Sequence, residues 1–168
     1  MHPYHHPLFV QFIVYFNDNQ DYFECHEVLE EYWKSLPDGD KEHPLTAYIL
    51  LSTGMYHWRR GNLTGAIRTL RKAEKKFPTF ATHFAEELDI QQLVSNVSHA
   101  VNLVEKESPF ESFSLLVTSV NLQAHITLAT QSMQLLAAGS DAVIHKHLLR
   151  DRTGVLQERE EKKKGRRH

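Results

Sequence analysis

Apolar residues recur every three or four positions along most of the chain, which is the pattern of helices with one buried face. Turn and helix-breaking residues separate these stretches, for example Gly61-Asn62 and Ser108-Pro109. The pattern predicts helices over residues 7–16, 21–35, 44–60, 62–77 and 89–107, and another from Asp141. We therefore expect an all-α fold, a single-domain helical bundle of antiparallel helical hairpins.

The predicted helices 21–35 and 44–60 stand at the centre of this bundle. Residues 44–60 are apolar nearly all the way round, as in a helix buried on every side. The short loop between the two helices favours an antiparallel pair. Gly54 removes a side chain from the second helix and should let another helix approach closely.

The C-terminal third has a weaker pattern. Phe113 to Val120 is rich in β-branched and aromatic residues and reads as extended, whereas Gln123 to Ala138 is weakly helical. Residues 157–168 are nearly all charged. The expected organisation is a helical domain over residues 1–156 and a disordered charged tail over residues 157–168.

Composition narrows the class of protein. The chain has 168 residues, 41% of them hydrophobic and 24% charged, with a formal net charge of -2. That charge gives no global attraction to nucleic acid or membrane, and no apolar run approaches the ~20 residues of a membrane span. The N-terminus lacks the cationic flank of a signal peptide, and a single cysteine, Cys25, excludes an internal disulfide. We expect a cytoplasmic protein.

The N-terminus carries three histidines, His2, His5 and His6, which could bind a metal ion. The first residues of most domains are solvated and mobile, so a mobile terminus is the expectation here.

Aromatic residues, a histidine and four carboxylates gather between Tyr22 and Trp33. At about 100° per residue, His26 and Glu30 fall inside the apolar face of the predicted helix. Burying such groups costs free energy unless they are paired, hydrogen-bonded or metal-bound. In the next helix, Arg60 shares the face of His57, and both should meet this cluster.

Three interpretations of the cluster stay open. His26, Glu30, His57 and Arg60 could form a hydrogen-bonded network that docks the two helices. Alternatively, His26, Glu30 and His57 could hold a divalent metal with Glu27 nearby, since His and Glu at i and i+4 point to one place. In the third interpretation the cluster lines a pocket for a small polar ligand, whose apolar walls are Tyr22, Trp33 and Trp58.

Other chemistry finds little support. Cys25 and His26 are neighbours on a helix and point about 100° apart, so Cys25 is expected to be a small core residue. Basic residues in two C-terminal segments, 145–152 and 162–167, could contact RNA, but glutamates dilute the second, and a solvated helix end is favoured. The sequence therefore argues against nucleic-acid binding through these segments.

Two segments carry a family resemblance. They read YFECHEVLEEYW from Tyr22 to Trp33 and HWRRGNLTGA from His57 to Ala66. These resemble the motifs YFE-x-HE-x-LE-x-x-W and H-x-x-RGN-x-x-GA of the domain-of-unknown-function 309 family, which is mainly bacterial. The resemblance implies an all-helical fold and carries the histidine, glutamate and tryptophan positions onto His26, Glu27, Glu30, Trp33 and His57. It implies no particular reaction.

The leading functional hypothesis is a non-catalytic interaction or ligand-sensing module, whose partner is a protein or a small molecule. It needs no cofactor. The first alternative is a metal-dependent hydrolase with His26, Glu30 and His57 as ligands and Glu27 as general base. The second is an RNA-binding protein that uses the C-terminal basic segments. The oligomeric state stays open.

Overall fold

The computed structural model describes residues 2–37, 43–80 and 85–145. They form α1 (Pro7–Val14), α2 (Tyr22–Ser35), α3 (Pro44–Arg59), α4 (Leu63–Lys76), α5 (Ile90–Glu105), α6 (Val120–Ser132) and α7 (Asp141–Ile144). Short helical turns η1 (Pro3–His5), η2 (Tyr15–Asn19) and η3 (Phe77–Phe80) complete the set. No strand forms within these residues, and an isolated antiparallel bridge joins Leu88 to Val117. The predicted all-α class is confirmed.

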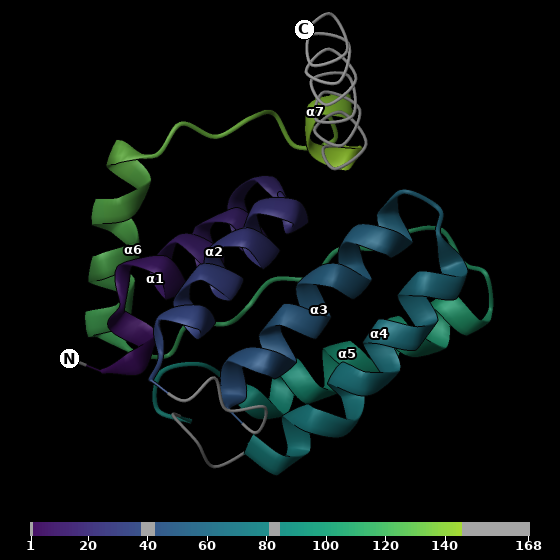
Figure 1. Ribbon diagram of the computed structural model, residues 1–168, viewed down its shortest axis with the longest axis horizontal. Coiled ribbons are helices and arrows are strands. Elements are labelled where there is room, and N and C mark those ends of the chain that lie inside the picture. Colours follow the sequence, from purple (N-terminus) through teal and green to yellow (C-terminus); the bar gives the residue numbers. More distant parts are fainter. Residues whose placement is uncertain (1, 38–42, 81–84, 146–168) are drawn as a thin grey trace, which may run out of the picture.

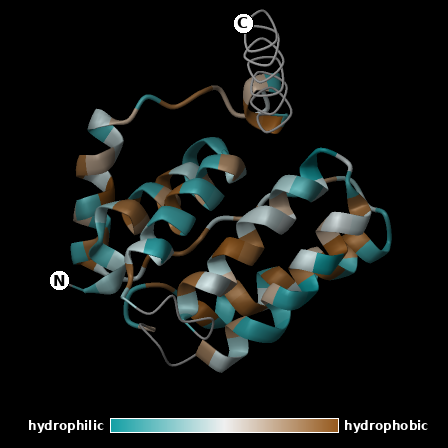
Figure 2. Cartoon of the chain, viewed as in Figure 1, coloured by the Kyte–Doolittle hydropathy of each residue, from teal (hydrophilic) through white to brown (hydrophobic). Residues whose placement is uncertain are grey.

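Neighbouring helices pack in the order α6, α1, α2, α3, α4, α5 (Figure 1). The first five helices therefore follow one another in space as they do in the chain, in short-looped pairs. The segment after α5 then returns across this row to bring α6 against α1 (Figure 1). Figure 2 shows both hydrophobic and polar residues along α2 and α4, as expected for helices with one buried face.

The central pair is antiparallel, as predicted. Near the start of α2, the Phe23 ring lies 5.9 Å from the Tyr56 ring near the end of α3. Near the end of α2, Trp33 shares a hollow with Thr46 and Ile49 from the start of α3. Opposite ends of the two helices therefore meet.

Close approach of α3 and α4 depends on Gly54, also as predicted. A Cβ atom built on Gly54 would lie 2.6 Å from both Cγ and Cδ2 of Leu70, and 3.0 Å from Oγ1 of Thr69. No real Cβ tolerates the first of these distances, so a methyl group at position 54 would push α4 away.

The N-terminus is packed onto the bundle, and the expectation of a mobile terminus is wrong for residues 2–6. Tyr4 is buried, its ring stacks on Phe9 at 4.1 Å, and its hydroxyl donates to the Tyr48 hydroxyl at 3.1 Å. The Tyr32 hydroxyl donates to the Pro3 carbonyl at 2.9 Å. Burial of an aromatic side chain stabilises this terminus by about 1.5–3 kcal/mol. This gain offsets the conformational entropy that the terminus loses when it is ordered.

Residues 108–119 run without helical structure, in agreement with the extended segment predicted from Phe113. Asn17 fixes this segment, because its amide donates to the Leu115 carbonyl at 3.0 Å and accepts from the Leu115 N–H at 2.8 Å. Phe110 packs against Trp58, with ring centroids 5.0 Å apart. Helix α6 ends at Ser132, whereas the helical pattern was predicted to reach Ala138.

Two predictions lie outside the described residues: the disordered tail over residues 157–168 and most of the basic segment 145–152.

Candidate functional site

The site begins at the N-terminus of α2, where Asp21 caps the helix. Its carboxylate accepts the N–H of Glu24 at 3.2 Å, which satisfies one of the free donors of the first turn. Asp21 is almost fully buried, with 1% of its surface exposed. This cap fixes the residue at which α2 begins.

His26 and Glu30 lie at the edge of the buried face of α2, and the prediction that they lie inside it is wrong. Each side chain is 33% exposed. The buried arc is centred on Cys25 and Leu29, because α1 packs on that side and the Cys25 thiol reaches the Phe12 carbonyl at 3.6 Å. His26 lies roughly 80° from the centre of that arc at 100° per residue.

Cys25 is the core residue that the sequence predicted. It is fully buried, and burial raises the pKa of its thiol well above the usual value. A thiol held in its neutral form is a poor nucleophile.

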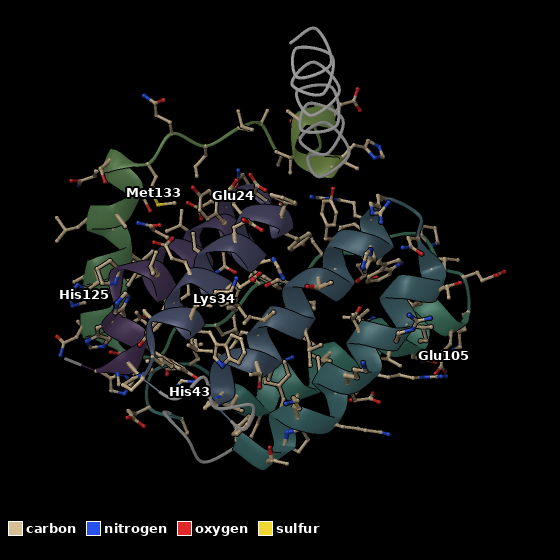
Figure 3. The ribbon with its side chains drawn as sticks, viewed as in Figure 1. Glu24, Lys34, His43, Glu105, His125 and Met133 are labelled. Carbon is tan, nitrogen blue, oxygen red and sulfur yellow. The ribbon has the colours of Figure 1, made fainter. Side chains whose placement is uncertain are left out.

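Three ligand-type side chains of α2 converge. His26 Nδ1 lies 3.4 Å from Glu27 Oε1, and His26 Nε2 lies 3.4 Å from Glu30 Oε2. One donor atom from each residue falls within 4.8 Å of the others. Lys34 Nζ contacts Glu30 Oε1 at 2.6 Å, and this hydrogen bond, helped by the His26 charge, lowers the pKa of Glu30. Figure 3 labels Lys34 and, toward the opposite end of α2, Glu24.

His57 and Arg60 form a second cluster at the turn between α3 and α4. Arg60 Nη2 lies 3.2 Å from His57 Nδ1, and Asn62 Nδ2 lies 3.3 Å from the same atom. Asn62 also caps α4, since its side-chain oxygen accepts the N–H of Gly65 at 3.1 Å. A Cβ on Gly65 would lie 2.7 Å from Asn62 Nδ2 and 3.1 Å from His57 Cδ2. The second motif therefore builds a turn.

The predicted four-residue network is thus two clusters, one on α2 and one at the α3–α4 turn. Among the described residues, His26, Glu27 and Glu30 meet the distance criterion for a metal group, and His57 does not join them. The predicted metal set of His26, Glu30 and His57 is not brought together. Glu27, expected as a general base, lies instead among the candidate ligands.

An apolar hollow of about 170 Å³ opens between α2 and α3 beside the His26 cluster. Tyr22, Phe23 and His26 line it from α2, and Thr53 and Tyr56 line it from α3. Tyr22 lies where a ligand wall was predicted. Trp33 instead lines a separate hollow with Thr46, Ile49, Leu50 and Lys76.

Trp58, which was also predicted as a ligand wall, is not among the residues that line the hollow between α2 and α3. Its ring contacts Phe110, and its indole N–H donates to the Ser108 carbonyl at 3.4 Å. It belongs to the core that the extended segment covers.

Sequence reasoning missed Arg59. Its guanidinium carbon lies 4.7 Å from the centre of the Tyr22 ring and 5.8 Å from that of Phe110. Burial lowers the pKa of Arg59, and its Nε and Nη2 atoms are buried without a hydrogen-bond partner. Cation–π contacts with these two aromatic rings stabilise the positive charge of Arg59. Phe110 is 51 positions away in the chain, so no local pattern signals the contact.

Comparison with known proteins confirms the family resemblance. The family described as "Domain of unknown function (DUF309)" matches residues 9–69, which span α1 to the middle of α4. The chain is 32% identical over 160 residues to "Uncharacterized protein YpuF" of Bacillus subtilis (strain 168), covering 90% of this chain and 91% of that protein. No solved structure matches. In the described part of the chain, every helix is too short or too polar to cross a membrane. The matched region and the near full-length similarity place this chain in the DUF309 family.

Proposed function

We propose that this protein is a non-catalytic ligand-binding module of the cytoplasm and that the hollow between α2 and α3 receives its ligand. The observation that carries this proposal is the adjacency of that apolar hollow to the ionisable cluster of the first motif, because His26 belongs to both. Binding sites commonly combine apolar walls with a few convergent polar groups.

The size of the hollow limits the ligand. A cavity of about 150 Å³ holds one benzene ring, so about 170 Å³ suits one aromatic ring or a branched aliphatic group. Phe23 and Tyr56 supply aromatic walls, and the Thr53 hydroxyl is already bonded to the Ile49 carbonyl at 3.0 Å. The interior therefore favours an apolar group.

The rim favours a cation. Glu27 and Glu30 lie beside His26, and Lys34 forms its ion pair with Glu30 and not with Glu27. A ligand with a ring and a short amine would bury its ring in the hollow and place its ammonium near Glu27. We expect the ligand class to be small aromatic amines.

Benzylamine and benzoate test this, because they share a ring and differ in the sign of their charge. We expect benzylamine to shift the NMR resonances of Phe23, Thr53 and Tyr56 with a Kd on the order of 1 mM, as suits so small a ligand. Benzoate should bind more weakly, and Glu27→Gln should narrow the difference.

Thr53→Ile fills the hollow and should abolish binding. The matched control is Thr127→Ile on α6, where an exposed threonine makes the same kind of bond, from its hydroxyl to the Gln123 carbonyl at 3.0 Å. Equal binding by the two variants, or an unchanged spectrum with either compound, would contradict the proposal.

A second candidate is metal binding at the His26 cluster, which the convergence of His26, Glu27 and Glu30 favours. All three ligands come from one helix, and Glu27 would be a ligand and no longer a base. Stoichiometric metal in untagged protein, lost in His26→Gln, would support this candidate over the apolar hollow.

A further inference from the structure

A second group of ligand-type side chains lies at the N-terminus, outside the region matched by the family. His5 Nε2 lies 2.8 Å from Glu87 Oε2, and His2 Nε2 lies 3.8 Å from Glu87 Oε1. One donor atom from each of the three falls within 4.8 Å of the others. Glu87 is buried, and the His5 and His2 side chains are 15% and 22% exposed.

The fold brings these residues together from distant parts of the chain. His2 caps the single helical turn η1 and His5 is the last residue of that turn, so their rings lie side by side with centroids 5.0 Å apart. Glu87 is just before α5, where Thr118 N–H donates to its carbonyl at 3.0 Å. The buried carboxylate of Glu87 thus lies beside two imidazoles.

We propose that His2, His5 and Glu87 form a binding site for a divalent transition metal, with zinc as the best fit. Zinc binds imidazole nitrogen and carboxylate oxygen at about 2.0–2.2 Å in a tetrahedron, whose ligand atoms are then about 3.3 Å apart. His5 lies 2.8 Å from one Glu87 oxygen, Oε2, and His2 lies 3.8 Å from the other, Oε1, so each imidazole is already near that separation from the carboxylate. Small movements of the side chains would place all three around one ion.

Neighbouring groups can complete the coordination. Glu86 Oε1 lies 3.4 Å from His2 Nε2, and the ring of His125 on α6 lies 5.0 Å from that of His5 (Figure 3). A hollow of about 260 Å³ between α1 and α6 is lined in part by His5 and His125, so it reaches one of the three proposed ligands. A fourth ligand from α6 would link that helix, through the metal ion, to the N-terminal turn η1 and to the segment just before α5.

Proton positions provide a specific reporter. His2 Nδ1 accepts the N–H of Tyr4 at 3.0 Å, so in the neutral ring the proton is on Nε2. A metal at Nε2 moves that proton to Nδ1, and Nδ1 then no longer accepts from Tyr4. Zinc binding therefore releases the Tyr4 amide, and its NMR resonance should shift.

The experiment titrates untagged, chelator-treated full-length protein with zinc and separately with cobalt. We expect one equivalent of zinc, the visible absorption of tetrahedral cobalt, a shifted Tyr4 amide and a melting temperature about 5 °C or more higher when zinc is in large excess over its Kd. His5→Gln and Glu87→Gln should each weaken zinc binding by at least about tenfold, because each removes one of three protein ligands.

Two controls locate the metal. His99→Gln removes an exposed histidine of α5 and should leave zinc binding unchanged. His26→Gln removes the ligand group of α2 and should also leave it unchanged, so this site and the α2 site are distinguished. Circular dichroism of each variant checks that the helices remain.

Three results would overturn the proposal. They are a wild-type protein that binds no stoichiometric zinc, a His5→Gln variant that binds it as tightly as His99→Gln, and binding that disappears only in His26→Gln. In the first case the cluster would be a hydrogen-bonded anchor for the N-terminus, and destabilisation by His5→Gln without zinc would show it.

Discussion

Gly54 is the residue where α4 approaches the backbone of α3. The distances of 2.6 Å from a built Cβ to Leu70 mean that an alanine cannot fit unless the leucine moves. Both residues are buried, so the neighbours have little room to yield.

Gly54→Ala should lower the free energy of unfolding by about 1–3 kcal/mol, the usual cost of overpacking a core. Leu70→Ala creates space at the same place but costs about 2–5 kcal/mol by itself. The double variant should be more stable than the sum of the two single losses predicts, by at least about 0.5 kcal/mol. Urea melts of the four proteins measure this, and strict additivity would contradict the close contact.

His57 and Glu30 were candidates for one network, and the structure separates them. His57 contacts Arg60 and Asn62 at the α3–α4 turn, whereas Glu30 contacts His26 and Lys34 on α2. A double-mutant cycle distinguishes one network from two because residues without shared partners lose stability independently.

His57→Ala should destabilise the protein by about 1–3 kcal/mol, because it leaves polar groups of the turn without their partner. Glu30→Gln should cost less than about 1 kcal/mol, since its ion pair is exposed. The double variant should equal the sum to within about 0.5 kcal/mol. Thermal melts of the two single variants and the double variant measure the coupling. A coupling free energy above about 1 kcal/mol would show that His57 and Glu30 belong to one network.

At the scale of elements, the extended segment after α5 is held by side chains rather than by a sheet. Both ends of the Asn17 amide bond the backbone of Leu115, and one isolated bridge joins Val117 to Leu88. Phe113 packs on Phe16, with ring centroids 5.4 Å apart. These contacts hold the segment against η2, and within the described residues it forms no sheet.

Asn17→Ala should cost about 1–3 kcal/mol, because it leaves the N–H and carbonyl of Leu115 unpaired. Asn102→Ala is the matched control, since Asn102 is exposed on α5, and it should change stability by less than about 0.5 kcal/mol. Hydrogen exchange at the Leu115 amide should accelerate in the first variant alone. Unchanged protection at Leu115 would mean that packing, and not Asn17, fixes the segment.

At the scale of the whole molecule, buried tyrosines limit stability at high pH. Burial raises the pKa of Tyr4, Tyr22 and Tyr48 above the ordinary value of 10.0. These groups are neutral in the native state and ionise more readily when the chain unfolds. Their stabilising contribution is therefore complete below pH 10 and falls as the pH rises above it.

Alkaline titration should show tyrosine ionisation in two stages. Tyrosines outside this group of three ionise first, and Tyr4, Tyr22 and Tyr48, each at most 2% exposed, ionise together as the helices unfold. Ultraviolet absorbance of tyrosinate and circular dichroism, recorded on the same samples, should coincide in the second stage. Tyr48→Phe should make the fall in stability above pH 10 less steep, and a single smooth titration that leaves the helical signal intact would contradict this prediction.

The sequence by itself determined the helices, the antiparallel central pair and the close contact at Gly54. Those features depend on local periodicity, capping residues such as Asp21 and the absence of a side chain at one position, all of which act within a few residues. The motif spacing also indicated the family. The chemistry of Cys25 followed from its place on the apolar side of its helix.

Only the tertiary structure decided which polar groups meet. The packing of α1 against Cys25 rotated His26 and Glu30 to the edge of α2, and the turn at Gly61 held His57 with Asn62 instead. The return of the segment after α5 placed Phe110 over Arg59, and the turn before α5 placed Glu87 beside His5. Those contacts join residues 51 and 82 positions apart, and helical periodicity carries no information over such separations.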